Sequence, residues 1–169
     1  TSVNASNPSG LERTVDAGFK HGAQSSTNQM RAYKVTTILT VFSIWLEFVI
    51  AASVVLFDPN NNTFPYTKIV LSWPGLLEEV HRVWALVILI LIMLNIYYTR
   101  KSALGKIQIL YSLLVLALFV LQAAFGAITI WSYDYPPFVL LHEGNAAILL
   151  MVSSLMLGRI LEPGLKPAY

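Results

Sequence analysis

The chain contains no cysteine and few charged residues. Without thiols it can form no disulfide, hold no iron–sulfur cluster through cysteine and use no cysteine nucleophile. Only 12% of its 169 residues are charged, roughly half the share that is usual in soluble proteins. Its net charge of +2 is too small to indicate a nucleic-acid partner. The low charge and the 56% hydrophobic content together predict an integral membrane protein rather than a soluble domain.

Four long apolar runs follow a polar N-terminal segment. Residues 1–34 are rich in serine, asparagine, glycine and threonine, and they are predicted to form a flexible cytoplasmic tail in which His21 is a solvated histidine. Each apolar run has the ~20 residues needed to cross a bilayer core of ~30 Å. The runs cover about 35–57, 80–99, 107–131 and 138–158, and residues 159–169 form a C-terminal tail. The expected fold is an all-α transmembrane bundle of four helices.

Basic residues gather in the short segments at one side of these runs. They are Arg31, Lys34, Arg100, Lys101, Lys106, Arg159 and Lys166. The other side has Lys68 and, at the edge of a run, Arg82. The positive-inside rule therefore predicts a multi-pass protein of the cell membrane with both termini in the cytoplasm. Asn61 begins a glycosylation sequon in the outer loop, and its modification is left open.

The first two runs faintly resemble the last two, which predicts a bundle of two similar helix pairs. Residues 45–52 can be laid on residues 120–127, so that Glu47 corresponds to Gln122. Each of these segments precedes an outer loop containing proline, and then a run with a histidine near its start. Such a repeat would bring the two histidines face to face across an axis parallel to the membrane normal.

These histidines, His81 and His142, are the main candidate ligands. Both runs that contain them enter the membrane from the outer side, so at 1.5 Å per residue they reach similar depths. An imidazole in a membrane is costly and usually has a partner. Two of them on separate helices can share one metal, which in a bilayer is most often haem iron, whereas zinc prefers four ligands. The alternative is two unrelated polar residues at helix ends.

Several neighbours of the histidines are further candidates. Ala85 and Ala146 each follow a histidine by four residues, so they share its helix face and leave room for a flat macrocycle. Glu78 shares a face with His81 and is a candidate catalytic carboxylate, unless it only favours the positive end of the helix. Three roles are open for Arg82: it pairs with a haem propionate, it extends to the membrane interface, or it pairs with Glu143.

Other polar and small residues lie inside the apolar runs. Glu47 belongs either to a proton or substrate path or to a neutral contact with a neighbouring helix, for which Gln122 is the candidate partner. Asn95 and Asn145 are predicted to form hydrogen bonds between helices. Gly126 and the alanines at 123, 124 and 127 form a small-residue patch suited to close packing.

Three short motifs carry a resemblance to a known family. They are Glu78-x-x-His81-Arg82 in the second run, Leu121-Gln122-x-x-x-Gly126-Ala127-x-Thr129 in the third, and Leu141-His142 in the fourth. Together they resemble the haem A synthase family over all four runs, in the short, four-helix, archaeal-type form. The resemblance implies oxidation of the C8 methyl of haem O to the formyl of haem A, the cofactor of terminal oxidases. It also implies that His81 and His142 are axial ligands and that Glu78 is the catalytic carboxylate.

Two departures keep other functions open. Many family members have a cysteine pair in the outer loop, and this chain has none. One histidine pair also cannot hold both a substrate haem and an electron-transfer haem, although a homo-oligomer could supply two sites. The alternatives are a non-catalytic haem b subunit of a respiratory complex and a haem-free transporter or scaffold. The expected partners are membrane lipid, haem, and a second copy of the chain or respiratory-complex subunits.

Overall fold

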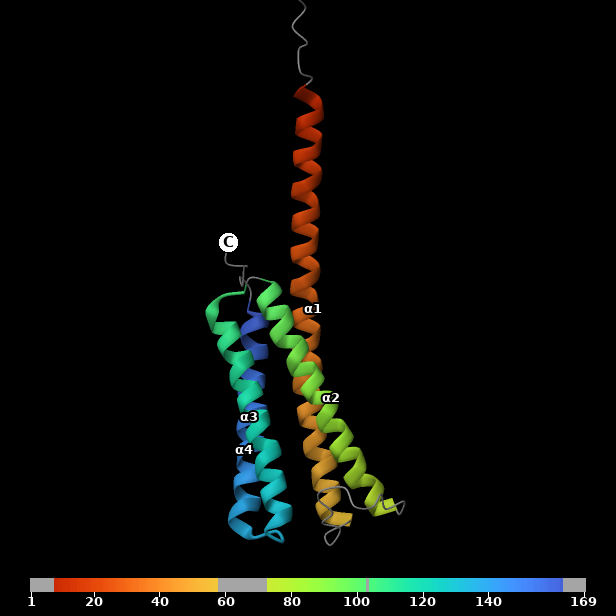
Figure 1. The fold of residues 1–169 in the computed structure, drawn as a ribbon, viewed down its shortest axis with the longest axis vertical. Helices are drawn as coiled ribbons and strands as arrows, with labels where there is room; N and C mark the ends of the chain where they lie inside the picture. Colours follow the sequence, from red (N-terminus) through yellow and green to blue (C-terminus); the bar gives the residue numbers. More distant parts are fainter. Residues whose placement is uncertain (1–7, 58–72, 103, 163–169) are drawn as a thin grey trace, which may run out of the picture.

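The computed structural model of the chain describes residues 8–57, 73–102 and 104–162. Its helices are α1 (Pro8–Phe57), α2 (Trp73–Lys101), α3 (Lys106–Trp131) and α4 (Pro136–Leu161), and the described residues form no strand (Figure 1). All four helices are long and apolar enough to cross a membrane. The prediction of an all-α, multi-pass membrane protein is therefore confirmed. The segments suited to the membrane are Thr27–Phe57, Gly75–Lys101, Lys106–Trp131 and Pro136–Leu161.

The N-terminal segment differs from the expected irregular tail because most of it is helical. Helix α1 begins at Pro8, and residues 8–34 continue into the first membrane span without a break. Proline suits the first turn of a helix, and extending an existing helix avoids the cost of nucleating a new one. Figure 1 shows this part of α1 projecting beyond the rest of the bundle. The flexibility of the segment stays a prediction, and the His21 side chain lies outside the described residues.

The helices form a ring in which each packs on its neighbours in space. Helix α1 packs on α2 and α4, and α3 packs on α2 and α4, so α2 and α4 lie diagonally across the bundle. The pairs α1–α2 and α3–α4 make the closest associations. In Figure 1 these two pairs separate from each other toward the end at which α2 and α4 begin. That end is where the candidate ligands lie.

Apolar side chains fill the interior and also cover much of the outer surface. The interior cluster consists of Ile44, Ile88, Ile92, Ile96, Val115, Leu149 and Val152. Large apolar side chains are exposed on all four helices, among them Phe42, Leu86, Leu110 and Met151. In water this exposure would be costly, but lipid tails are as apolar as these side chains. The outer surface is therefore suited to contact with lipid.

A buried asparagine joins α1 to α2. Asn95 Oδ1 accepts hydrogen bonds of 2.9 Å from the hydroxyls of both Thr36 and Thr37, and its Nδ2 donates to Thr40 Oγ1 at 2.6 Å. All four side chains are buried. Their pairing avoids leaving polar groups unsatisfied away from water. The prediction that Asn95 forms hydrogen bonds between helices is confirmed.

A tight turn joins α3 to α4. Tyr133 and Asp134 have φ angles of 54° and 57°, which lie in the left-handed region. The amide of Asp134 donates to the carbonyl of Thr129 at 3.0 Å, and Pro136 then begins α4. This turn places the start of α4 directly beside the end of α3. The loop with the Asn61 sequon lies outside the described residues.

Candidate functional site

The two histidines lie at the same end of the bundle. His81 is eight residues after the start of α2, and His142 is six residues after the start of α4. Both helices begin at the end where the helix pairs separate (Figure 1). A difference of two positions corresponds to about 3 Å along the helix axis. The fold therefore places the two histidines that the sequence singled out at the same end of the bundle, on diagonally opposite helices.

His81 has a carboxyl group as its neighbour. Its Nδ1 lies 3.1 Å from Oε1 of Glu47 on α1, and the two side chains are 30% and 16% exposed. The two atoms do not form a hydrogen bond, because Nδ1 is a buried atom without a hydrogen-bond partner; the other carboxyl oxygen, Oε2, is also buried and unpartnered. The expected pairing of Glu47 with Gln122 is therefore wrong. An imidazole and a carboxyl group that face each other reduce the cost of placing either one in the membrane.

His142 has an amide as its neighbour. The Nε2 of Gln122 on α3 lies 3.2 Å from both ring nitrogens of His142. Asn145 Nδ2 donates to Gln122 Oε1 at 2.7 Å and to the backbone carbonyl of Leu118 at 3.0 Å. The prediction that Asn145 forms hydrogen bonds between helices is confirmed. Asn145 also holds in place the amide that contacts His142.

Gly126 lets the His142 ring approach the backbone of α3. A Cβ atom added at Gly126 would lie 3.0 Å from Cε1 and 3.4 Å from Nδ1 of the ring. The first distance is shorter than ordinary van der Waals contact and the second lies at its lower limit, so a side chain at position 126 would require the ring to move by a few tenths of an ångström. Ala123 and Ala124, by contrast, are exposed. Of the predicted small-residue patch, Gly126 is thus a member that packs against the His142 ring, and Ala127 is half-buried.

An acidic and basic cluster stands beside His81 on α2. Arg82 pairs with Glu78 through Nη2, and its Nη1 donates to Glu79 Oε1 at 3.1 Å. The Glu78 residue is 6% exposed, whereas the Glu79 side chain is 20% exposed. Sequence spacing alone barely separated these two glutamates, and burial now distinguishes them. Arg82 is engaged with acidic residues of its own helix, as a bidentate guanidinium allows.

The remaining predicted residues lie on the expected helices. Ala85 and Ala146 are half-buried, one turn after His81 and His142. Their role in leaving room for a macrocycle stays a prediction. Nearby, the indole Nε1 of Trp84 donates to the Ser43 carbonyl at 3.1 Å and ties α2 to α1 close to the site.

Sequence reasoning did not include Glu47 and Gln122 among the site residues. The sequence suggests a path or a structural contact for Glu47, and it suggests Gln122 as the partner of Glu47 and as part of a family motif. The signal that would have found them is the internal alignment, which lays Glu47 on Gln122. Each of the two contacts the histidine of the helix that follows its own.

The donor set fits a haem better than a bare metal ion. Haem iron takes four nitrogens from its macrocycle and needs only two axial ligands, which two imidazoles can supply. Zinc prefers three or four protein ligands. Within the described part of the chain, no group of three or more histidine, cysteine, aspartate or glutamate side chains is placed to hold a metal ion. The unsatisfied buried atoms of the His81–Glu47 pair also suit a site that a bound group completes.

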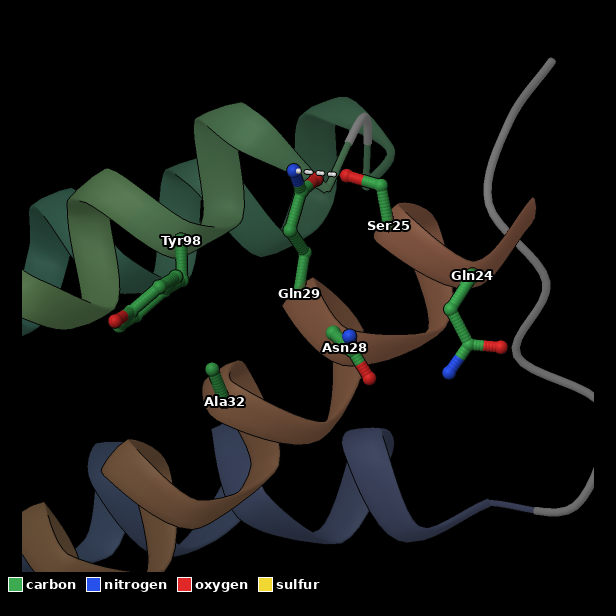
Figure 2. A pocket seen from close by; sticks show the side chains of 6 residues that line it. All are labelled: Gln24, Ser25, Asn28, Gln29, Ala32 and Tyr98. Atoms are coloured by element: carbon green, nitrogen blue, oxygen red, sulfur yellow. Dashed lines mark hydrogen bonds between the residues drawn. The ribbon is translucent and has the colours of Figure 1, made fainter. Parts of the chain in front are cut away.

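A shallow polar hollow lies at the other end of the bundle. It is formed by the N-terminal part of α1 and the last turns of α2 (Figure 2). Its lining residues are Gln24, Ser25, Asn28, Gln29, Ala32 and Tyr98. None of them contributes to the histidine site. The hollow is open to the surface, and none of its lining residues is a candidate ligand or catalytic residue.

Comparison with known proteins identifies one family. Residues 29–154, which include most of all four membrane helices, match the family model COX15-CtaA, described as cytochrome oxidase assembly protein. No curated protein and no solved structure matches the chain.

Proposed function

The chain belongs to the COX15-CtaA family of cytochrome oxidase assembly proteins, and from that membership we propose that it is a haem A synthase. In this proposal it oxidises the C8 methyl group of haem O to the formyl group of haem A. Family membership supports a haem-related cofactor and a role in oxidase assembly. The observation that carries the finer proposal is the position of His81 and His142 at one end of the bundle, beside the buried Glu78.

The proposed haem is held by side chains from two diagonally placed helices. His81 of α2 and His142 of α4 would hold the haem iron through their imidazole nitrogens. The small side chains of Ala85 and Ala146 leave space on the adjacent helix faces for the edge of a flat ring. Arg82 is suited to a propionate because its planar guanidinium matches a carboxylate, and a propionate would compete there with Glu78 and Glu79.

Glu78 is the proposed catalytic carboxylate. Conversion of a methyl to a formyl group (R–CH₃ + H₂O → R–CHO + 4 H⁺ + 4 e⁻) takes its oxygen from water, passes its electrons to an external electron acceptor and releases protons, so a nearby proton acceptor assists it. Glu78 is buried and lies three residues before His81 on the same helix. Its ion pair with Arg82 fixes the position of the carboxylate. Glu79 has the same chemistry but is more exposed, which makes it the natural control.

A specific observation also favours a second candidate, a non-catalytic haem b subunit of a respiratory complex. Glu78 is already paired with Arg82, which is what a carboxylate with a purely structural role would do. A single histidine pair also accounts for one resident haem. Such a subunit would pass electrons or stabilise its complex without changing the haem.

The proposal includes an orientation and an assembly. Both termini are placed in the cytoplasm because basic residues gather at that side, and the histidine site then lies in the outer half of the membrane. In Figure 1 the C-terminal end of α4 and the connection between α2 and α3 lie at the same end of the bundle, as this orientation requires. A homo-oligomer would supply the second haem site that one chain lacks.

The test is the identity of the haem in the purified, detergent-solubilised chain after it is supplied with haem O. Haem is extracted and separated chromatographically from the original protein and from the Glu78→Ala and Glu79→Ala variants. We expect haem A from the original protein and from Glu79→Ala, and a fall of about a hundredfold or more with Glu78→Ala, the usual effect of losing a general base.

Two other results would speak against the enzyme. Retention of haem b without any conversion of haem O would support the electron-transfer subunit. Absence of a Soret band in every preparation would reject both haem-binding functions.

A further inference from the structure

The neighbours of the two histidines differ in hydrogen-bonding character. Glu47 offers His81 carboxyl oxygens, and its Oε1 lies 3.1 Å from Nδ1 of the ring. Gln122 offers His142 an amide nitrogen, which lies 3.2 Å from both ring nitrogens. A carboxylate oxygen accepts hydrogen bonds, whereas an amide nitrogen only donates them. The two imidazoles therefore stand in opposite surroundings.

The orientation of the Gln122 amide follows from its own partners. Asn145 Nδ2 lies 3.0 Å from the backbone carbonyl of Leu118, and a carbonyl can only accept, so Asn145 presents its NH₂ group there. The same NH₂ group donates to Gln122 Oε1 at 2.7 Å. With its oxygen committed to Asn145, Gln122 turns its NH₂ group toward His142. A chain of hydrogen bonds that starts at the backbone thus fixes Gln122 as a donor.

This difference decides how readily each ring can bind iron. A neutral imidazole binds a metal through the nitrogen that has a lone pair, and its other N–H prefers an acceptor. At His81, the Glu47 carboxyl oxygen faces Nδ1 at 3.1 Å, which favours the tautomer with its proton on Nδ1 and would leave the lone pair of Nε2 for the metal. At His142, the NH₂ group of Gln122 lies equally close to both ring nitrogens and can donate to whichever of them has the lone pair. His142 must give up that contact before it can bind iron.

We infer that His81 is the permanent axial ligand of the haem and His142 an exchangeable one, restrained by Gln122 and Asn145. This inference rests on the proposed haem site and assigns different roles to its two histidine ligands. Exchange at His142 opens one face of the iron to a small ligand such as cyanide or added imidazole. It also gives a haem that has to enter and leave the site one bond to break instead of two.

The first experiment uses the full chain in detergent, with ferric haem b as the probe. Haem retention is measured from the Soret band after gel filtration, and coordination from electron paramagnetic resonance. We expect His142→Ala to retain haem in a five-coordinate, high-spin form. Added imidazole should return it to the low-spin form. We expect His81→Ala to retain at least about tenfold less haem, because the restrained His142 is then the only ligand.

A second set of variants keeps both histidines. Gln122→Leu removes the donor, and Asn145→Leu lets the Gln122 amide turn its oxygen toward the ring. Both should raise the low-spin fraction and weaken cyanide binding by roughly threefold to tenfold, the effect of releasing one hydrogen bond. Gln108→Leu is the matched control, because Gln108 is a buried glutamine of α3 in the half of that helix that is remote from His142. It should leave both readouts unchanged.

The outcomes separate this inference from the proposed function. If the original protein takes up no haem, the haem site itself is rejected and the inference falls with it. If the original protein takes up haem but His81→Ala and His142→Ala lose it equally, only the inference is overturned. It is also overturned if Gln122→Leu binds cyanide as tightly as the Gln108→Leu control.

Discussion

Replacing Gly126 by alanine tests the close contact between α3 and the His142 ring. The added methyl carbon would lie 3.0 Å from Cε1 and 3.4 Å from Nδ1. The ring must shift by a few tenths of an ångström to accept it. Gln122, 3.2 Å from both ring nitrogens, restricts that movement. We therefore expect the methyl group to strain the packing and displace the imidazole.

Two opposing effects set the magnitude. Alanine is preferred over glycine inside a helix by about 0.5–1 kcal/mol. Overpacking a well-filled site costs about 1–3 kcal/mol. Gly144→Ala on α4 isolates the first effect, because a Cβ atom at that position meets nothing within 4 Å. The free energy of unfolding of Gly126→Ala should therefore be about 1–3 kcal/mol lower than that of Gly144→Ala.

The assay is unfolding by sodium dodecyl sulfate titrated into micelles of a mild detergent, followed by circular dichroism. The electron paramagnetic resonance spectrum of the haem-loaded protein is a second readout, because displacement of His142 should raise the high-spin fraction. The reasoning would be refuted if Gly126→Ala stabilised the protein as much as Gly144→Ala and left the spectrum unchanged. That result would mean that the ring does not rest against α3.

Three further predictions concern the bundle and its orientation. Asn95→Leu should lower the free energy of unfolding by about 2 kcal/mol in the same titration, since it removes three hydrogen bonds between helices, each worth ~0.6 kcal/mol; an unchanged midpoint would contradict this. Because the chain has no cysteine, Tyr135→Cys should react with an impermeant maleimide in intact cells and Gly105→Cys only in inverted vesicles, and the reverse pattern would overturn the proposed orientation. Tyr133→Gly should raise the free energy of unfolding by about 1 kcal/mol in the same titration, since it relieves a left-handed tyrosine; a lower midpoint would contradict this.

The number and type of the helices could be predicted from the sequence because membrane insertion is governed by local composition. A bilayer core demands about 20 apolar residues in a helix, whatever the neighbouring helices are. The helical extension before the first span was not predicted. The polar composition of residues 1–34 indicated a loose tail, whereas residues 8–34 are helical as a continuation of α1.

The site was predicted in part. His81, His142 and Glu78 stood out because polar residues are rare inside apolar runs and because their motifs resemble those of a known family. The contacts between them could not be predicted in the same way. The sequence suggested a contact between Glu47 and Gln122, because an alignment of repeats shows which residues correspond but does not show which of them are in contact.

By itself, the sequence determined a four-helix membrane protein of the haem A synthase type, with two histidines near the starts of two helices. The number of helices and the positions of the histidines follow from composition and spacing, which act along the chain, whereas the family is indicated by the resemblance of three short motifs. Only the tertiary structure decided that a carboxyl oxygen faces His81 and an amide nitrogen faces His142. The order of the helices around the bundle sets these contacts, and no local pattern encodes which side chains meet across it. The physical difference between the two candidate ligands comes from that packing.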